Sequence, residues 1–186
     1  DDLRLAPFHL AAILYAIAAA LIGIGLAGAG TWLVRGGLAA MVGAWFVHGA
    51  GIMARVILGE RPPVSNFYET MLWLPFVLAS LALVFARLYR AAVFGLAGAA
   101  LAAIVLGLAQ QVPLDASIAP VAAVLRSNLW LTVHVLTIVS SYGALALATG
   151  LAHVYGGSWL LRGGAHPALP SLATFLYRAI QVGVVL

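Results

Sequence analysis

Two histidines lie within long apolar stretches of this sequence, where a buried imidazole could bind a metal. His48 falls near the middle of the apolar run 36–54, and His134 lies six residues after Asn128. An ionisable side chain at such depth in a membrane segment is costly, so it marks a candidate functional site. A neutral imidazole there needs either a hydrogen-bonding partner or a metal, and one possibility is axial ligation of haem iron.

Both hypotheses stay open for His134. Thr137 and Ser141 follow it at the spacing of one helix face and form a polar stripe. A packed histidine bonded across helices to a Ser or Thr would fit this stripe, and so would a haem ligand. The other three histidines fall near expected helix ends or in a loop, where water or headgroups can solvate them: His9, His153 and His166.

Polar and aromatic residues are also concentrated between residues 55 and 73. Asn66, followed three residues later by Glu69, predicts a capped helix start. Capping does not account for Arg61 and Tyr68. An arginine beside aromatic rings suits a flat anionic ligand such as haem, so these two residues are candidates for binding it. The candidate cofactor-binding residues are therefore these two together with His134, His48 and Trp130, which lies near the start of the fifth apolar stretch.

The composition requires that these residues be positioned by membrane helices. Hydrophobic residues make up 65% of the 186 residues and charged residues only 8%, whereas soluble domains have roughly 45–50% and about 25%. A soluble globular enzyme is excluded. We predict an all-α, polytopic membrane helical bundle in one domain, with five complete transmembrane helices and a sixth truncated at the chain end. The expected spans are about 7–30, 37–58, 68–86, 91–110, 128–155 and 172–186.

Charge gives information on partners and topology. The nine basic residues are all arginine, and the net charge is +4. They are scattered singly between apolar runs, so we expect a lipid bilayer as surroundings and no nucleic acid as partner. Arginines on connections divide equally between the two membrane faces, four on each, so the positive-inside rule favours neither orientation strongly. We expect an external N-terminus.

Three segments resemble the CcsA/ResC proteins of system II cytochrome c biogenesis. His48 to Glu69 includes Gly-Glu-Arg-Pro-Pro-Val-Ser-Asn-Phe-Tyr-Glu, which is similar to that family's Gly-Arg-Pro-Pro-Val-Thr-Asn stretch with its Tyr-Glu/Ser ending. Ser127 to Tyr142 is similar to the family's Trp-Leu-x-x-His-Val helix. Phe175 to Gly183 resembles the helix that follows. The three segments occur in the family's order and at plausible spacing.

The resemblance implies a membrane component of a cytochrome c haem lyase or synthase. Such a protein presents haem b, as cargo, at the outer face of the bacterial cytoplasmic membrane for attachment to apocytochrome c, with a ResB-type partner. His134 matches the family's external haem ligand, and His48 matches a histidine of some branches only. Asn66, Tyr68 and Glu69 match the motif without an assigned chemical role.

The sequence also departs from the family pattern. The tryptophan-rich haem loop, a second external histidine and a membrane histidine should follow the sixth span, and none occurs before Leu186. Either the chain is the retained part of a longer protein, or it is a relative without the synthase apparatus. We favour the first, because the sequence stops within an apolar helix that has no end signal.

Two other functions remain as alternatives. One is a structural or assembly subunit of a larger membrane complex that uses the same fold without haem. The other is an electron-transfer cytochrome b with haem between two helices. The second fits less well, because His48 and His134 lie about 15 Å and about 9 Å from the outer helix ends and not at matched depth.

Overall fold

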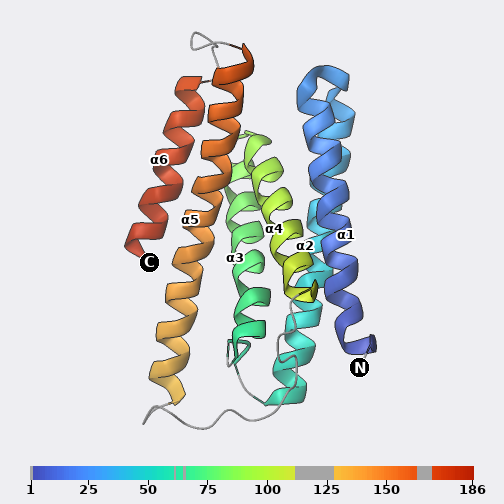
Figure 1. Ribbon diagram of the computed structural model, residues 1–186, viewed down its shortest axis with the longest axis vertical. Helices are drawn as coiled ribbons and strands as arrows, with labels where there is room; N and C mark the ends of the chain where they lie inside the picture. Colours follow the sequence, from blue (N-terminus) through green and yellow to red (C-terminus); the bar gives the residue numbers. More distant parts are fainter. Residues whose placement is uncertain (1, 61, 65, 112–127, 163–168) are drawn as a thin grey trace.

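The computed structural model describes residues 2–60, 62–64, 66–111, 128–162 and 169–186, and within these ranges it contains helices and no strand. Figure 1 shows a bundle of upright helices. The elements are α1 (Asp2–Ile24), which continues into the π-helical turn η1 (Gly25–Ala29), α2 (Thr31–Gly59), α3 (Phe67–Leu88), α4 (Val93–Gln111), α5 (Asn128–Arg162) and α6 (Leu169–Val185). The predicted all-α class is confirmed.

Five of these helices are long and apolar enough to cross a membrane, and α6 is a shorter apolar helix. The chain is thus a multi-pass membrane protein, as the composition indicated. The first turn lies a few residues earlier than the connection of residues 31–36 that the predicted spans leave between them. Gly28 and Gly30 have φ angles of 112° and 129°, a backbone conformation that residues other than glycine rarely adopt. The chain reverses direction there, and α2 already begins at Thr31.

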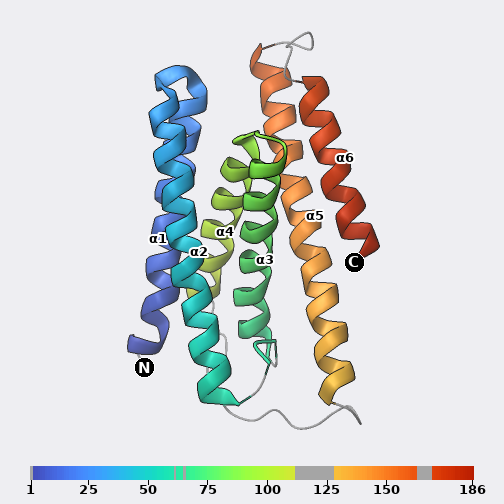
Figure 2. The same cartoon turned by 180° about the vertical axis from the view of Figure 1, so that it is seen from behind.

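The helices form three antiparallel pairs. The α3–α4 pair lies in the middle, with α1–α2 on one side and α5–α6 on the other (Figures 1 and 2). α1 packs against α2 and α4, while α3 packs against α4 and α5. The start of α1, the α2–α3 connection and the start of α5 share one end of the bundle, called the N-terminal end below (Figure 1). The opposite end carries the α1–α2 and α3–α4 turns.

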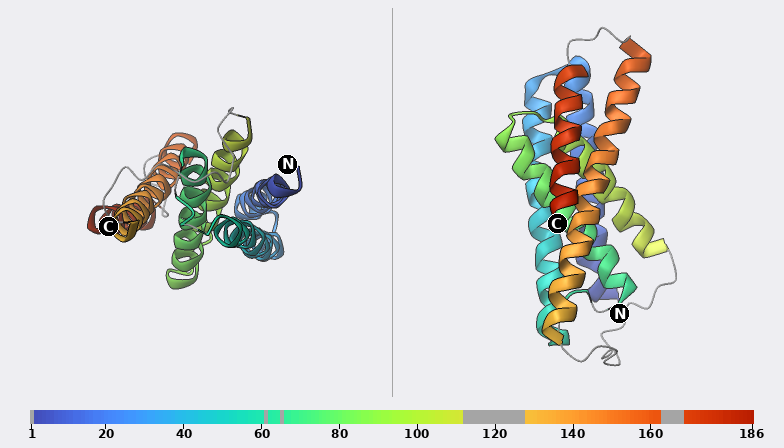
Figure 3. Two further views of the ribbon diagram at one scale, coloured as in Figure 1. Left: turned by 90° about the horizontal axis from the view of Figure 1, so that it is seen from below. Right: turned by 90° about the vertical axis from the view of Figure 1, so that its left-hand side faces the viewer.

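α6 is about half as long as α5, with 17 residues against 35. It therefore covers the second half of α5 and leaves the first half without α6 alongside it (Figure 3, right). Ser141 marks the far limit of this contact, because its hydroxyl donates to the carbonyl of Gly183 near the end of α6 at 2.6 Å. The first turns of α5, which include His134, project beyond α6.

Both ends of α3 have defined capping structures. At its start the backbone N–H of Glu69 donates to Oδ1 of Asn66 at 2.8 Å, which confirms the predicted cap. At its end the N–H of Ala91 donates to the carbonyl of Ala86 at 3.2 Å, and Arg90 has a φ of 52°. This is the Schellman arrangement, in which the left-handed position is usually glycine. An arginine there costs roughly 1–2 kcal/mol.

Small residues bring α3 and α4 close together. Gly98 on α4 faces Ala82 on α3 with no room for a further carbon atom, and its nearest other neighbours are Met41 and Leu78. In lipid, where the hydrophobic effect does not drive helices together, such close backbone packing is a main source of association energy.

We therefore predict that Gly98→Ala lowers the free energy of unfolding by about 1–3 kcal/mol, the usual cost of overpacking. Gly107→Ala is the matched control on the same helix, because a Cβ there meets no atom within 4 Å. It should be neutral or stabilise by about 0.5–1 kcal/mol through helix propensity. Thermal unfolding in detergent, followed by circular dichroism, compares the two. Equal effects would contradict the packing described.

Candidate functional site

The interface between α2 and α3 contains three polar contacts at successive depths. Nε1 of Trp45 donates to Oγ of Ser80 at 2.7 Å. Nε2 of His48 contacts the carbonyl of Leu72 at 3.0 Å. Nη2 of Arg55 lies 3.2 Å from Oε1 of Glu69. The α2 members share one helix face, as do the α3 members, because their spacings approximate whole turns. The two antiparallel helices are thus held in register by polar groups.

His48 lies in the middle of this interface and is fully buried. A carbonyl oxygen can only accept, so Nε2 carries the proton and donates to Leu72. Nδ1 is then an acceptor, and the hydroxyl of Tyr15 on α1 lies 3.5 Å from it. Both ring nitrogens of His48 therefore contact protein groups. This arrangement corresponds to the first possibility for a buried imidazole, a hydrogen-bonding partner.

Three aromatic rings surround His48 edge-on. The ring centroids of Phe8, Tyr15 and Phe76 lie 5.9, 6.0 and 5.4 Å from that of the imidazole. The imidazole is thus enclosed by rings from α1 and α3. Pro75 lies one turn after Leu72 inside α3, and its missing N–H leaves the carbonyl of the neighbouring Met71 without an intrahelical donor.

Nearer the N-terminal end, Arg55 and Glu69 form an ion pair whose side chains are only 5% and 3% exposed. The guanidinium carbon of Arg55 also lies 5.1 Å from the ring centroid of Tyr68, a cation–π arrangement. Tyr68 and Glu69 therefore contact Arg55 directly, while Asn66 caps the helix turn that carries them, so the start of α3 is fixed against the end of α2.

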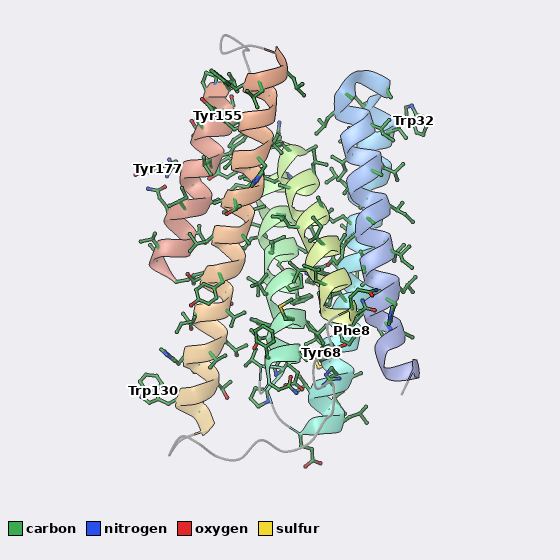
Figure 4. The ribbon with its side chains drawn as sticks, viewed as in Figure 1. Phe8, Trp32, Tyr68, Trp130, Tyr155 and Tyr177 are labelled. Carbon is green, nitrogen blue, oxygen red and sulfur yellow. The ribbon has the colours of Figure 1, made fainter. Side chains whose placement is uncertain are left out.

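His134 and Trp130 lie apart from this group. They are one turn from each other on the first half of α5, and both are exposed, Trp130 at 72%. Figure 4 shows Trp130 on the outer side of α5, whereas Phe8 and Tyr68 lie among the other helices. The other two residues of the predicted polar stripe, Thr137 and Ser141, donate hydrogen bonds to backbone carbonyls. The hydroxyl of Thr137 donates to the carbonyl of Val133 at 2.8 Å, and Ser141 bonds to α6.

The predicted site residues thus fall into two groups, one inside the α2–α3 interface and one on the outer face of α5. Arg61 lies outside the described residues. Tyr15 and Leu72 were not predicted from the sequence as partners of His48. Nor was Arg55 predicted as the partner of Glu69.

No family model matches the sequence. The chain is similar to a cytochrome c biogenesis protein. Over 95 residues, 50% of the chain, it is 32% identical to the cytochrome c biogenesis protein CcsA of Cyanidium caldarium. The aligned region is 31% of CcsA, so the chain spans about a third of the length of the curated relative it matches. This similarity agrees with the resemblance that the motifs indicated and supports a CcsA-like protein.

The buried ion pair gives a prediction for stability. Replacing either partner alone, in Glu69→Leu or Arg55→Leu, leaves a buried charge without its counter-ion and should cost about 3–5 kcal/mol. The double replacement removes both charges, so it should be more stable than the sum of the two single effects implies. Thermal unfolding of the three variants in detergent measures the coupling.

Arg178→Leu is the control, because Arg178 is an exposed cation that bonds to Gln181 one turn along α6. Its effect should stay within about 0.5 kcal/mol. Strictly additive effects of the two buried replacements would show that Arg55 and Glu69 do not interact as described.

Proposed function

We propose that this chain is a haem-handling membrane subunit of a cytochrome c synthase and that His134 is an axial ligand of the haem iron. One observation carries the proposal. Of the two histidines singled out within apolar stretches, His134 is exposed on α5, whereas both ring nitrogens of His48 contact protein groups. The similarity to CcsA supplies the functional context.

The surroundings of His134 suit a porphyrin. Trp130, one turn away, and the exposed side chains of Leu129 and Val133 give this part of α5 aromatic and aliphatic surface. Porphyrin faces are apolar, and neutral imidazole is a common donor to haem iron. His134 itself is exposed on α5, so in this proposal its imidazole faces the cargo.

In this proposal haem b is cargo and apocytochrome c is the client. Attachment through thioether bonds needs client thiols and reduced iron. The chain contains no cysteine, so it supplies no thiol of its own. Its residues would hold the iron by His134 and orient the ring along α5, which is the positioning role that proteins have toward such groups. A ResB-type partner and a bacterial cytoplasmic membrane location belong to the same proposal.

The α2–α3 residues have a supporting role in this scheme. Asn66, Tyr68 and Glu69 would set the position of the N-terminal end of α3 through Arg55, and Arg61 would remain available to the cargo propionates. His48 would maintain the spacing of α1, α2 and α3 through its contacts with Tyr15 and Leu72.

A structural or assembly subunit without haem is the second candidate. The observation in its favour is that His48, Arg55 and Glu69 all bond within the bundle, as scaffold residues do. The absorption spectrum of the purified chain separates the two functions, because only the first predicts bound haem.

We predict that protein purified from haem-replete membranes has a Soret band and that His134→Ala loses most of it. His153→Ala is the matched control, since His153 is exposed on the same helix and its Nδ1 bonds to the carbonyl of Thr149 at 2.8 Å. His48→Leu should keep the band in whatever protein remains folded, although it removes two buried contacts. An unchanged Soret band in His134→Ala would exclude the ligand assignment. Loss of the band only in His48→Leu would assign haem to the other histidine.

The proposal places the N-terminal end of the bundle outside the membrane, and the absence of cysteine makes this testable without background labelling. Glu60→Cys, at the α2–α3 connection, should react in intact cells with a membrane-impermeant maleimide. Arg35→Cys, near the opposite end, should react only after the cells are permeabilised. The reverse pattern would contradict the orientation.

A further inference from the structure

The last turns of α3 form an open pocket at the end of the bundle opposite to the N-terminus. Its volume is about 590 Å³, and it is lined by Leu83, Val84, Arg87, Leu88 and Arg90. Two guanidinium groups therefore lie beside an apolar strip on the lateral surface of one helix. Val84 and Leu88 are 56% and 66% exposed, so the strip faces the surroundings of the bundle.

Among the residues that the structure describes, the two arginines have no counter-ion. Both are exposed, and within the described ranges neither forms an ion pair or a hydrogen bond through its side chain. The acidic residues that the structure describes all belong to the N-terminal end, at the start of α1 and around the α2–α3 connection: Asp2, Glu60 and Glu69. The positive charge of this pocket is not balanced locally.

The pocket lies at the depth of a lipid headgroup. Arg87 is 21 residues after Asn66, the cap of α3, which corresponds to about 32 Å of helix at ~1.5 Å per residue. The hydrocarbon layer is about 30 Å thick. If the cap of α3 lies at one boundary of that layer, Arg87 lies at the other, and Leu83 and Val84 lie one turn inside it.

The backbone that carries the arginines is held in place by aromatic packing. Tyr89, between them, stacks on Phe94 with centroids 5.7 Å apart and also contacts Phe175 of α6 at 5.3 Å. Arg87 is favourable at a helix C-terminus for the helix dipole alone. Arg90 has no such explanation, because it occupies the left-handed position of the Schellman arrangement, where glycine would be unstrained. A strained residue held by its surroundings points to a use for its side chain.

We propose that this pocket binds an anionic phospholipid. The phosphate would lie between the guanidinium groups of Arg87 and Arg90, which suit phosphate oxygens. The first carbons of an acyl chain would lie along Leu83, Val84 and Leu88. Basic pockets at the ends of membrane helices bind lipid headgroups in this way. The site is independent of haem binding and goes beyond the proposed function.

The test compares lipids on the detergent-purified full chain by native mass spectrometry and thermal unfolding. Dioleoyl phosphatidylglycerol should remain bound and raise the unfolding temperature, whereas dioleoyl phosphatidylcholine should do neither. Arg87→Gln combined with Arg90→Gly should weaken phosphatidylglycerol binding about tenfold or more, as expected for two basic residues near an anionic headgroup. Inorganic phosphate should not reproduce the effect, because it lacks the acyl chain.

Two single variants separate binding from folding. Arg90→Gly should unfold at an equal or higher temperature in lipid-free neutral detergent, since glycine relieves the left-handed strain, yet it should bind less phosphatidylglycerol. Arg35→Gln removes an exposed arginine from α2 near the same end of the bundle and should leave binding unchanged. The site would be overturned if the double variant keeps its preference for phosphatidylglycerol, if Arg35→Gln weakens binding equally, or if phosphate alone stabilises equally.

Discussion

Within a bilayer no water is available to polar side chains, so the protein or a ligand must satisfy each of them. The buried pair of Arg55 and Glu69 is the strongest case of this constraint here, because both side chains are at least 95% buried. Their contact sets where α3 begins relative to α2. The same register then aligns His48 with Leu72 and Trp45 with Ser80. The backbones of α2 and α3 pack less closely than those of the three antiparallel pairs, and side chains connect the two helices, these polar groups and the stacked rings of Trp45 and Phe76 among them.

This constraint divides the polar residues of the chain into two classes. Those of the α2–α3 interface contact other protein groups. Arg55 pairs with Glu69, and the two ring nitrogens of His48 lie 3.0 and 3.5 Å from the Leu72 carbonyl and the Tyr15 hydroxyl. His134 lies on the first half of α5, on turns that α6 does not cover. The arginines at the end of α3 likewise face outward. A ligand is therefore expected at the outward-facing groups, whereas the inward-facing groups keep the helices that carry them at fixed spacing.

Much of the fold follows from the sequence, because apolar runs between single arginines define membrane helices directly. The cap of α3 was also predictable, since it depends on Asn66 and Glu69 three residues apart. The first turn was expected between the predicted spans 7–30 and 37–58, a few residues too late, because the positive φ angles that reverse the chain belong to Gly28 and Gly30. The site was predicted less well. His48 bonds to a backbone carbonyl and to a tyrosine 33 residues away, and neither partner has a local signal in the sequence.

In the proposed function the exposed His134, and not the buried His48, coordinates the haem iron. A structure of the full haem-loaded protein in lipid nanodiscs distinguishes the two histidines. We expect density for a porphyrin beside the first turns of α5, with the iron coordinated by His134 and with His48 still bonded to the carbonyl of Leu72. A porphyrin between α2 and α3, with its iron on His48 and the contact to Leu72 broken, would contradict it.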